Sequence, residues 1–212
     1  MLLASTGSAQ SLVYPIKRPE GVQTAAAYYA RGRALYRRGQ FAGVIEDLYT
    51  ATNLREDYPQ AQLLLARVLV QAERSREAVS TLRGLALPYR TSPKALKLFG
   101  WAYYRLNWVN DAEEVVQASG QAAGRPDAEV HCLLGLIRLR QQDATDAMRQ
   151  AERALAIRPH YALAYRLLSD AYLLQGKEKL ARRCLQQQLA HSRDPQTARE
   201  IRQRLRMLQS MN

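Results

Sequence analysis

The chain has 212 residues, of which 47% are apolar and 24% are charged, and its formal net charge is +12. That apolar content suffices for a large buried core, whereas no stretch approaches the roughly eighteen consecutive apolar residues of a transmembrane helix. Cys132 and Cys184 form no CxxC pair, which excludes a typical zinc site, and two lone thiols indicate a reducing compartment. The positive charge is spread along the chain with a bias toward the C-terminus. It favours acidic partners or high solubility over a dedicated nucleic-acid arm.

Residues 1–24 are predicted to form a flexible or extended leader, because Pro15 and Pro19 interrupt any helix and small polar residues dominate the rest. Residues 12–16, with the sequence LVYPI, form an apolar strip that fits a groove of this chain or of a partner; an unstructured leader is the alternative. Residues 1–9 resemble the end of a signal peptide without its basic and apolar parts. Because the two lone thiols indicate a reducing compartment, we expect a cytoplasmic protein. The alternative is a periplasmic protein, if residues 1–9 are the remnant of a signal peptide.

A fixed period dominates the rest of the chain. Five small residues lie 34, 34, 35 and 34 residues apart: Gly32, Ala66, Gly100, Gly135 and Ser169. A period of this length is typical of a solenoid in which one helical hairpin stacks on the next. We therefore predict five stacked helical hairpins, and such a stack offers a long surface for binding.

The residues around this period resemble the tetratricopeptide repeat, which has an aromatic residue at positions 4 and 12, glycine at 8 and 15, and small residues at 20 and 27. The first unit begins at Ala25 and matches at Tyr28, Gly32, Tyr36, Gly39 and Ala51. The fourth matches at Gly135, Ala147, Ala154 and Pro159, and the fifth at Tyr165, Gly176 and Ala181. The second and third units are weaker, with Glu73 and Asn107 where the pattern has glycine.

The resemblance implies an all-α fold, a right-handed superhelical solenoid of tetratricopeptide-like hairpins with a C-terminal capping helix. The five hairpins are expected at residues 25–58, 59–92, 93–127, 128–161 and 162–194, and the capping helix at 195–212. Small residues allow two helices to approach closely. Gly39 and Gly176 are expected to take the left-handed conformation that ends a first helix.

The capping helix is predicted because each amphipathic hairpin leaves one apolar face uncovered until the next element stacks on it. Three apolar residues fall on one side of this helix: Ile201, Leu205 and Leu208. We expect them to cover Leu173, Leu180 and Leu185. Four arginines are expected to face water: Arg199, Arg202, Arg204 and Arg206. Asp194, just before Pro195, is the expected N-cap.

In the family, positions 2, 5, 9, 12 and 13 of each first helix line a concave groove. Carried over, these positions give a candidate peptide-binding set: Tyr29, Arg33, Tyr36, Arg37, Arg67, Lys94, Lys97, Trp101, Tyr104, Arg105, Leu136, Arg140 and Arg166. Cys132 falls on the same positions. The groove is expected to be basic and aromatic in the first three units and more apolar in the last two. This pattern predicts a protein or peptide partner that carries both acidic and apolar residues.

Alternative functions fit the sequence less well. The carboxylate clamp by which some tetratricopeptide domains hold chaperone tails is matched only at Lys94. No glycine-rich phosphate loop is present, and the three histidines, His131, His160 and His191, have no metal-ligand or triad spacing, so neither an enzyme nor a cofactor or metal is expected. The alternative function is RNA or single-stranded DNA binding through the basic, aromatic surface. The leading interpretation is a non-catalytic scaffold or chaperone-like adaptor, as in bacterial secretion or pilus machines.

Overall fold

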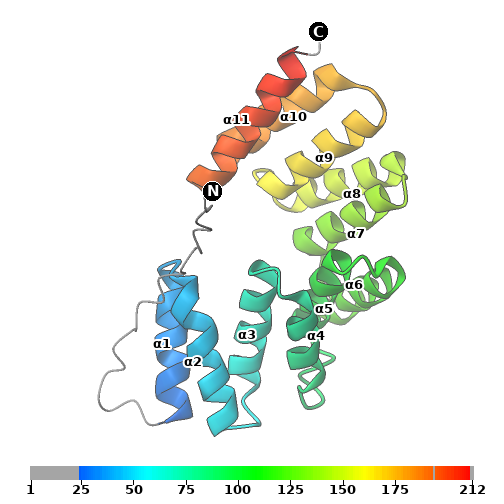
Figure 1. Cartoon of the computed structure of the whole chain (residues 1–212). Coiled ribbons are helices and arrows are strands. Elements are labelled where there is room, and N and C mark those ends of the chain that lie inside the picture. The colour runs from blue at the N-terminus through cyan, green and yellow to red at the C-terminus, as the bar shows by residue number, and fades with distance from the viewer. Residues whose placement is uncertain (1–23, 193, 211–212) are drawn as a thin grey trace, which may run out of the picture. The chain divides into compact units, whose positions relative to one another are not determined.

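The computed structural model describes residues 24–192 and 194–210 (Figure 1). The predicted leader with its apolar strip lies outside these residues, apart from Thr24. The chain divides into two compact units, one ending at Glu56 and the other beginning at Asp57. The described residues form eleven α-helices and no strand.

The first unit is a single helical hairpin of α1 (Ala25–Arg37) and α2 (Phe41–Leu54). Thr24 caps α1 by accepting a hydrogen bond from the amide of Ala27, at 3.2 Å. Gly32 lies against α2, where a Cβ atom would stand 3.3 Å from the side chain of Leu48. The guanidinium of Arg31 pairs with the buried Asp47, with Nε 2.6 Å from Oδ2. A close contact and a half-buried ion pair therefore hold the two helices together.

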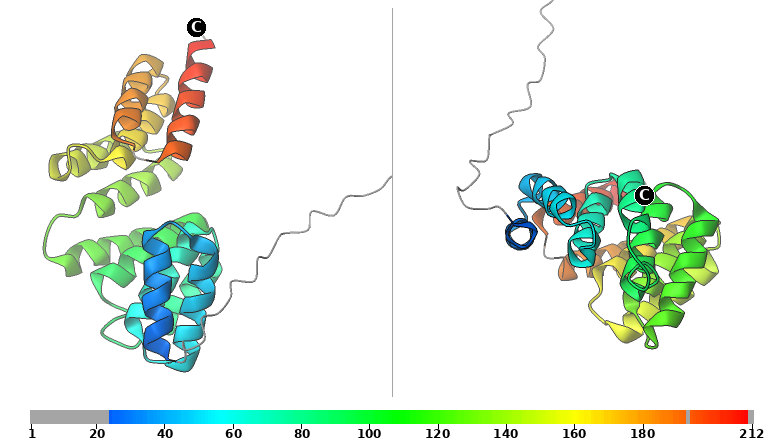
Figure 2. Two further views of the ribbon diagram at one scale, coloured as in Figure 1. Left: turned by 90° about the vertical axis from the view of Figure 1, so that its left-hand side faces the viewer. Right: turned by 90° about the horizontal axis from the view of Figure 1, so that it is seen from below.

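The second unit contains four hairpins and a final helix (Figures 1 and 2). Its first helices are α3 (Pro59–Gln71), α5 (Pro93–Arg105), α7 (Ala128–Arg140) and α9 (Ala162–Leu174). Its second helices are α4 (Ser75–Arg83), α6 (Val109–Ala123), α8 (Ala144–Ile157) and α10 (Glu178–His191), and α11 (Pro195–Ser210) follows. Each second helix packs against the next first helix, and the first helices also contact one another in series. The first helices thus form one continuous row.

Two glycines allow first helices of this unit to pack closely against neighbouring helices. A Cβ atom on Gly100 would lie 2.3 Å from a methyl group of Val116 on α6, and one on Gly135 would lie 2.3 Å from a methyl group of Leu167 on α9. No side chain fits at such distances. The hairpin of α3 and α4 is less regular, because α4 has only nine residues and an irregular segment with Gly84 and Pro88 follows it.

Arg138 on α7 ties three helices together. Its Nη1 donates to Oε2 of Glu113 on α6 at 2.9 Å, and its Nε donates to Oδ2 of Asp146 on α8 at 2.8 Å. The hydrogen bonds from Arg138 hold the pKa of Glu113 below its usual range. This ion-pair network joins consecutive hairpins through side chains of α6, α7 and α8.

All five hairpin turns use one residue in the left-handed conformation. The prediction is confirmed at Gly39, with φ 72°, and at Gly176, with φ 70°. Glu73, Asn107 and Gln142 take the same conformation, with φ of 62°, 62° and 63°. In each turn the next backbone N–H donates to a carbonyl five residues back in the first helix, as Asp143 does to Arg138 at 2.9 Å. The turn geometry is therefore kept where glycine is missing, at a conformational cost to the side chain.

This cost makes a testable prediction at Gln142, whose side chain is exposed. Gln142→Gly should raise the free energy of unfolding by about 0.5–1 kcal/mol, because a left-handed residue with a Cβ is strained and glycine is not. Urea unfolding would measure the change. The matched control is Gln175→Gly, one residue before Gly176, where φ is −90°. There glycine should lower the stability, and equal effects at the two positions would contradict the explanation.

The final helix covers the apolar end of the fourth hairpin of this unit. Ile201 and Leu208 are buried against Leu185, with Leu173, Leu189 and Leu205 packed around them. Asp194 is confirmed as the N-cap, since the amide of Thr197 donates to its Oδ2 at 2.7 Å.

Two details of the predicted cap are wrong. Leu180 remains 38% exposed with α11 in place, because it lies on the side of α10 opposite the buried Leu185. Arg204 does not simply face water: its Nη2 stands 2.5 Å from Oδ1 of Asp170 on α9. The cap is thus held by an ion pair as well as by its apolar contacts.

Deletion of the residues after Asp194 should lower the melting temperature and promote self-association. The truncation uncovers Leu173, Leu185 and Leu189, and burial of apolar surface stabilises a fold by about 25 cal/mol per Å². Differential scanning calorimetry and analytical ultracentrifugation would show both effects. Arg202→Gln with Arg206→Gln is the control, since both side chains are exposed and the melting temperature should hardly change. A truncated chain that stays monomeric and melts like the parent would show that α11 is not a cap.

Candidate functional site

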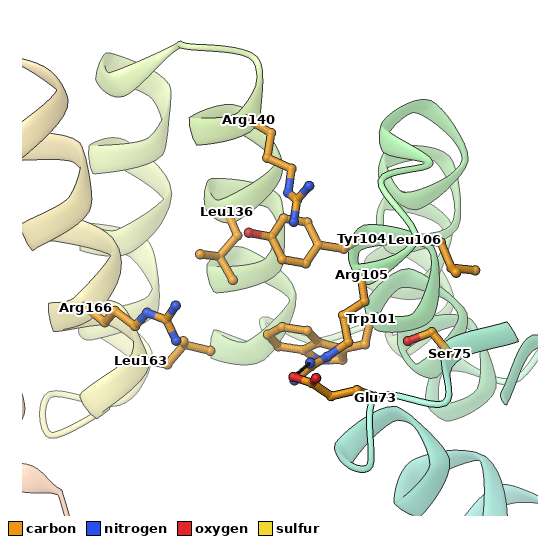
Figure 3. Close-up of a pocket in the computed structure, with 10 residues that line it drawn as sticks. All are labelled: Glu73, Ser75, Trp101, Tyr104, Arg105, Leu106, Leu136, Arg140, Leu163 and Arg166. Carbon is orange, nitrogen blue, oxygen red and sulfur yellow. Dashed lines mark hydrogen bonds and ion pairs between the residues drawn. The ribbon is translucent and has the colours of Figure 1, made fainter. Parts of the chain in front are cut away.

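Two adjoining hollows lie along the row of first helices in the second unit. The larger hollow has a volume of about 740 Å³ and is bordered by residues of α5, α7 and α9 and by the turn after α3 (Figure 3). The smaller hollow, of about 240 Å³, lies between α3 and α5 and reaches Glu129 on α7. Trp101 and Arg105 line both hollows. We call the two together the groove.

Nine of the thirteen candidate residues line this groove: Arg67, Lys94, Lys97, Trp101, Tyr104, Arg105, Leu136, Arg140 and Arg166. The other four are on α1 in the first unit: Tyr29, Arg33, Tyr36 and Arg37. There the guanidinium of Arg33 lies 5.9 Å from the ring centre of Tyr29, and Tyr36 packs edge-on against Phe41. The structure therefore collects the candidates of the second unit on one surface.

Cys132 does not line the groove. It is fully buried between α7, α8 and α9 in a cluster with Ala128, Ala154 and Ala164. Burial raises the pKa of its thiol to about 12, so it stays protonated. The position rule failed here because a small side chain at this place is covered by the neighbouring helices.

Glu129 and Leu163 line the groove but were not among the candidates. Each is the second residue of its helix, and Lys94 holds the same place in α5. This shared position in the helix could have identified Glu129 and Leu163 from the sequence. No such position marks Glu73, which lies in the turn after α3 and borders the larger hollow.

Trp101 occupies the middle of the groove and is held from two sides. Its Nε1 donates to Oε1 of Glu129 at 3.0 Å, and its ring packs edge-on against Tyr104 with the ring centres 6.3 Å apart. Lys97 in turn binds Glu129 at 2.9 Å and Asp127 at 2.6 Å. Asp127 also caps α7 by accepting a hydrogen bond from the amide of Glu129 at 2.8 Å. The indole is therefore oriented by a chain of ion pairs.

Most cations of the groove are already compensated by partners within the chain. Arg105 pairs with Glu73 at 3.1 Å, and Arg166 lies 3.7 Å from Asp170. Arg140 stacks on Tyr104, 4.2 Å from its ring centre, and donates to the side-chain oxygen of Asn107. These cations are less available to an acidic partner than the sequence suggested.

Arg67 and Lys94 are different. Among the described residues neither has an ion-pair partner, and both line the smaller hollow beside Trp101. Burial, together with the positive charge of Arg67, lowers the pKa of the Lys94 ammonium. Two like charges near each other without a carboxylate leave this end of the groove positive. The buried side chains of Val70 and Leu98 form the apolar part of the same hollow.

The histidines lie away from the groove. His131 is held by the side chain of Gln150, with Nδ1 2.9 Å from Oε1, as expected of a satisfied histidine inside a hairpin. The rings of His160 and His191 lie 4.6 Å apart. Within the described part of the chain, no three His, Cys, Asp or Glu side chains gather as a metal site requires. None of the described helices is long and apolar enough to span a bilayer.

Helical hairpins that stack in series define an α-helical repeat protein. No family model and no curated protein matches the sequence, whereas several solved structures match the fold. TTC0263 of Thermus thermophilus, a tetratricopeptide-repeat protein, is similar with a TM-score of 0.73 and 17% identity, over 87% of this chain and 98% of that one. PilF of Pseudomonas aeruginosa gives 0.64 and 17%, over 88% and 84%. Yeast Tom70 gives 0.65 and 13%, over 89% and 40%. The chain thus has the tetratricopeptide-repeat fold, as the repeat pattern predicted.

The ion pairs of Lys97 predict a pH dependence. Burial lowers the pKa of Lys97, but its bonds to Asp127 and Glu129 outweigh burial and leave that pKa raised. Burial raises the pKa of Asp127, yet the bonds from Lys97 and from backbone amides leave it below its usual value. Asp127 therefore stabilises the fold above its unfolded pKa, and this contribution is lost as the pH falls through the lower folded pKa. The contribution of Lys97 is lost only as the pH rises through its raised pKa.

Lys97→Met should therefore lower the stability by about 1 kcal/mol near neutral pH, because the carboxylates lose their partner. The difference from the parent should shrink as the pH is lowered below about 4. Urea unfolding between pH 7 and pH 3 would measure it. Lys179→Met, at an exposed position of α10, is the control and should cost little at any pH. A difference that stays constant down to pH 3 would contradict the role of Asp127.

Proposed function

We propose that this chain is a non-catalytic scaffold for protein–protein interaction, and that its groove binds an extended peptide with acidic residues at one end and apolar residues at the other. The main support for this proposal is that Arg67 and Lys94 line the groove without a carboxylate partner among the described residues. An acidic side chain of a partner would relieve their mutual repulsion and form charge-assisted hydrogen bonds.

The apolar end of the peptide would occupy the larger hollow. Leu136 and Leu163 line it together with the rings of Tyr104 and Trp101 (Figure 3). The arginines of this hollow have partners in the chain, so apolar and aromatic contacts supply the attraction here. A rigidly held indole at the junction is a suitable anchor, because aromatic side chains contribute strongly to protein interfaces.

An adaptor in a multiprotein assembly is the setting that this site fits best. The similarity to structures such as PilF and Tom70 supports the scaffold class through the shared fold. A chaperone-like subunit of a bacterial secretion or pilus machine is the more specific form of the proposal. A cytoplasmic location goes with it, or a periplasmic one if residues 1–9 are the remnant of a signal peptide.

A synthetic peptide tests the proposal. The probe is a peptide of about ten residues with two aspartates at one end and two leucines at the other, titrated into a Trp108→Phe background so that Trp101 alone reports binding by fluorescence. Arg67→Gln with Lys94→Gln should weaken binding about tenfold, because two charge-assisted contacts are lost. Arg76→Gln with Arg153→Gln changes the net charge equally at exposed positions outside the groove and should leave the affinity unchanged.

A second peptide, with asparagine in place of aspartate, should bind the parent and the double variant alike. If the variant of Arg67 and Lys94 binds the acidic peptide as tightly as the parent does, these two cations do not bind the aspartates of the peptide. Binding of a single-stranded RNA oligonucleotide at about 150 mM salt, lost in the same variant, would instead support the nucleic-acid alternative.

A further inference from the structure

The C-terminal end of the second unit has a charge balance unlike the rest of the chain. Residues 177–210 contain nine lysines and arginines but only three acidic residues, a net charge of +6 out of the +12 of the whole chain. The other residues hold 22 cations and 16 carboxylates. Elsewhere the chain therefore has roughly three acidic residues for every four basic ones, whereas here it has one for every three.

The cations at this end lie on the exposed sides of α10 and α11. We define the terminal basic face by three exposed arginines that share one side of α11: Arg199, Arg202 and Arg206. The opposite side of α11 carries the buried Ile201 and Leu208, which pack against Leu185 of α10. The packing of the cap therefore fixes which side of each helix faces outward.

These three side chains have no carboxylate partner among the described residues. In α10 and α11 the one recorded ion pair with a carboxylate is that of Arg204, which lies apart from the face and binds Asp170. The groove cations Lys97 and Arg105, by contrast, each pair with an acid in the chain. The charge of the terminal basic face is thus open to an outside partner.

The spacing of the cations makes this face repel itself. Arg199 and Arg202 are three residues apart in α11, and Arg202 and Arg206 are four apart. Like charges at these spacings are neighbours on a helix surface and destabilise it. The helix that closes the stack carries this repulsion, and binding of an anionic surface would remove it.

We propose that the terminal basic face binds the surface of a membrane rich in anionic phospholipids. Several cations on one helical surface are attracted to an anionic leaflet, and arginine binds phosphate oxygens in a bidentate way. Within the second unit α11 is at the edge, packed against α10, and no other described helix of this unit covers its outer side (Figure 2). The contact is peripheral, since it needs no membrane-spanning helix.

Two observations favour a membrane over a nucleic acid. The sequence contains no Phe, Tyr or Trp after Tyr172, so α10 and α11 offer no aromatic platform on which bases stack. Met207, next to Arg206, is 54% exposed. An apolar side chain among arginines suits the boundary between headgroups and acyl chains, whereas a phosphate backbone offers it nothing.

Vesicle sedimentation with the full chain tests the proposal. The probes are vesicles of phosphatidylcholine alone and vesicles with about 30% phosphatidylglycerol, a fraction that gives an anionic surface. The chain should bind the anionic vesicles at about 50 mM salt, leave the neutral ones free, and dissociate near about 500 mM salt because the charges are screened. A chain that does not bind the anionic vesicles at low salt overturns the proposal.

Matched variants locate the contact. Arg199→Gln, Arg202→Gln and Arg206→Gln together should lower the partition coefficient at least about tenfold, because each cation contributes separately. The control replaces three exposed arginines elsewhere in the second unit with glutamine: Arg76, Arg125 and Arg153. It should change the partition coefficient less than about twofold. An equal loss in the control would mean that total charge, and not this face, binds the vesicles.

Two further measurements complete the test. Circular dichroism melting should show that both triple variants are folded, and the groove peptide should bind them as it binds the parent, so this result is separable from the proposed function. A labelled DNA duplex is the last probe. If the duplex binds the parent at about 150 mM salt but does not bind the variant of Arg199, Arg202 and Arg206, and the parent does not bind vesicles, the face binds nucleic acid and the proposal is overturned.

Discussion

The close approach of helices at one small residue per hairpin is the constraint on which the second unit depends. At Gly100 and Gly135 a single added carbon would collide with Val116 or Leu167 at 2.3 Å. Because these contacts bring α5 onto α6 and α7 onto α9, they set the spacing of the first helices that form the groove. The left-handed turn residue repeats the same reversal in every hairpin, even where it is Gln142 and not glycine.

The electrostatics of the groove follow from this spacing. Residues about one repeat apart come into contact, so Lys97 meets Asp127 and Arg105 meets Glu73. These pairs use up charge that would otherwise meet a partner, and they orient Trp101 through Glu129. The groove therefore combines a rigid aromatic centre with a positive end at Arg67 and Lys94. Specificity in such a site depends on which cations the chain itself leaves unpaired.

Much of the fold was predictable because it rests on local periodicity. The repeat spacing, the left-handed Gly39 and Gly176, the apolar side of α11 and the N-cap Asp194 all depend on residues a few positions apart. The same regularity placed the candidate residues of the second unit along one surface, and their role in binding stays a prediction. Errors arose where a neighbouring helix decides the outcome, as for Cys132 and Arg204. A helical pattern shows which side of its own helix a residue occupies, but not what covers that side.

The sequence by itself determined the helical hairpins, their period, the small residues that permit close packing and the amphipathic cap, since each can be recognised from the order of residues along the chain. Only the tertiary structure decided which charges cancel. Lys97 and Asp127 are 30 residues apart, and Arg204 and Asp170 are 34 apart. The repeat brings such residues near one another, but whether two charges pair depends on distances of a few ångströms between side chains of different helices. Those distances decide which cations of the groove and of the terminal basic face remain open to a partner.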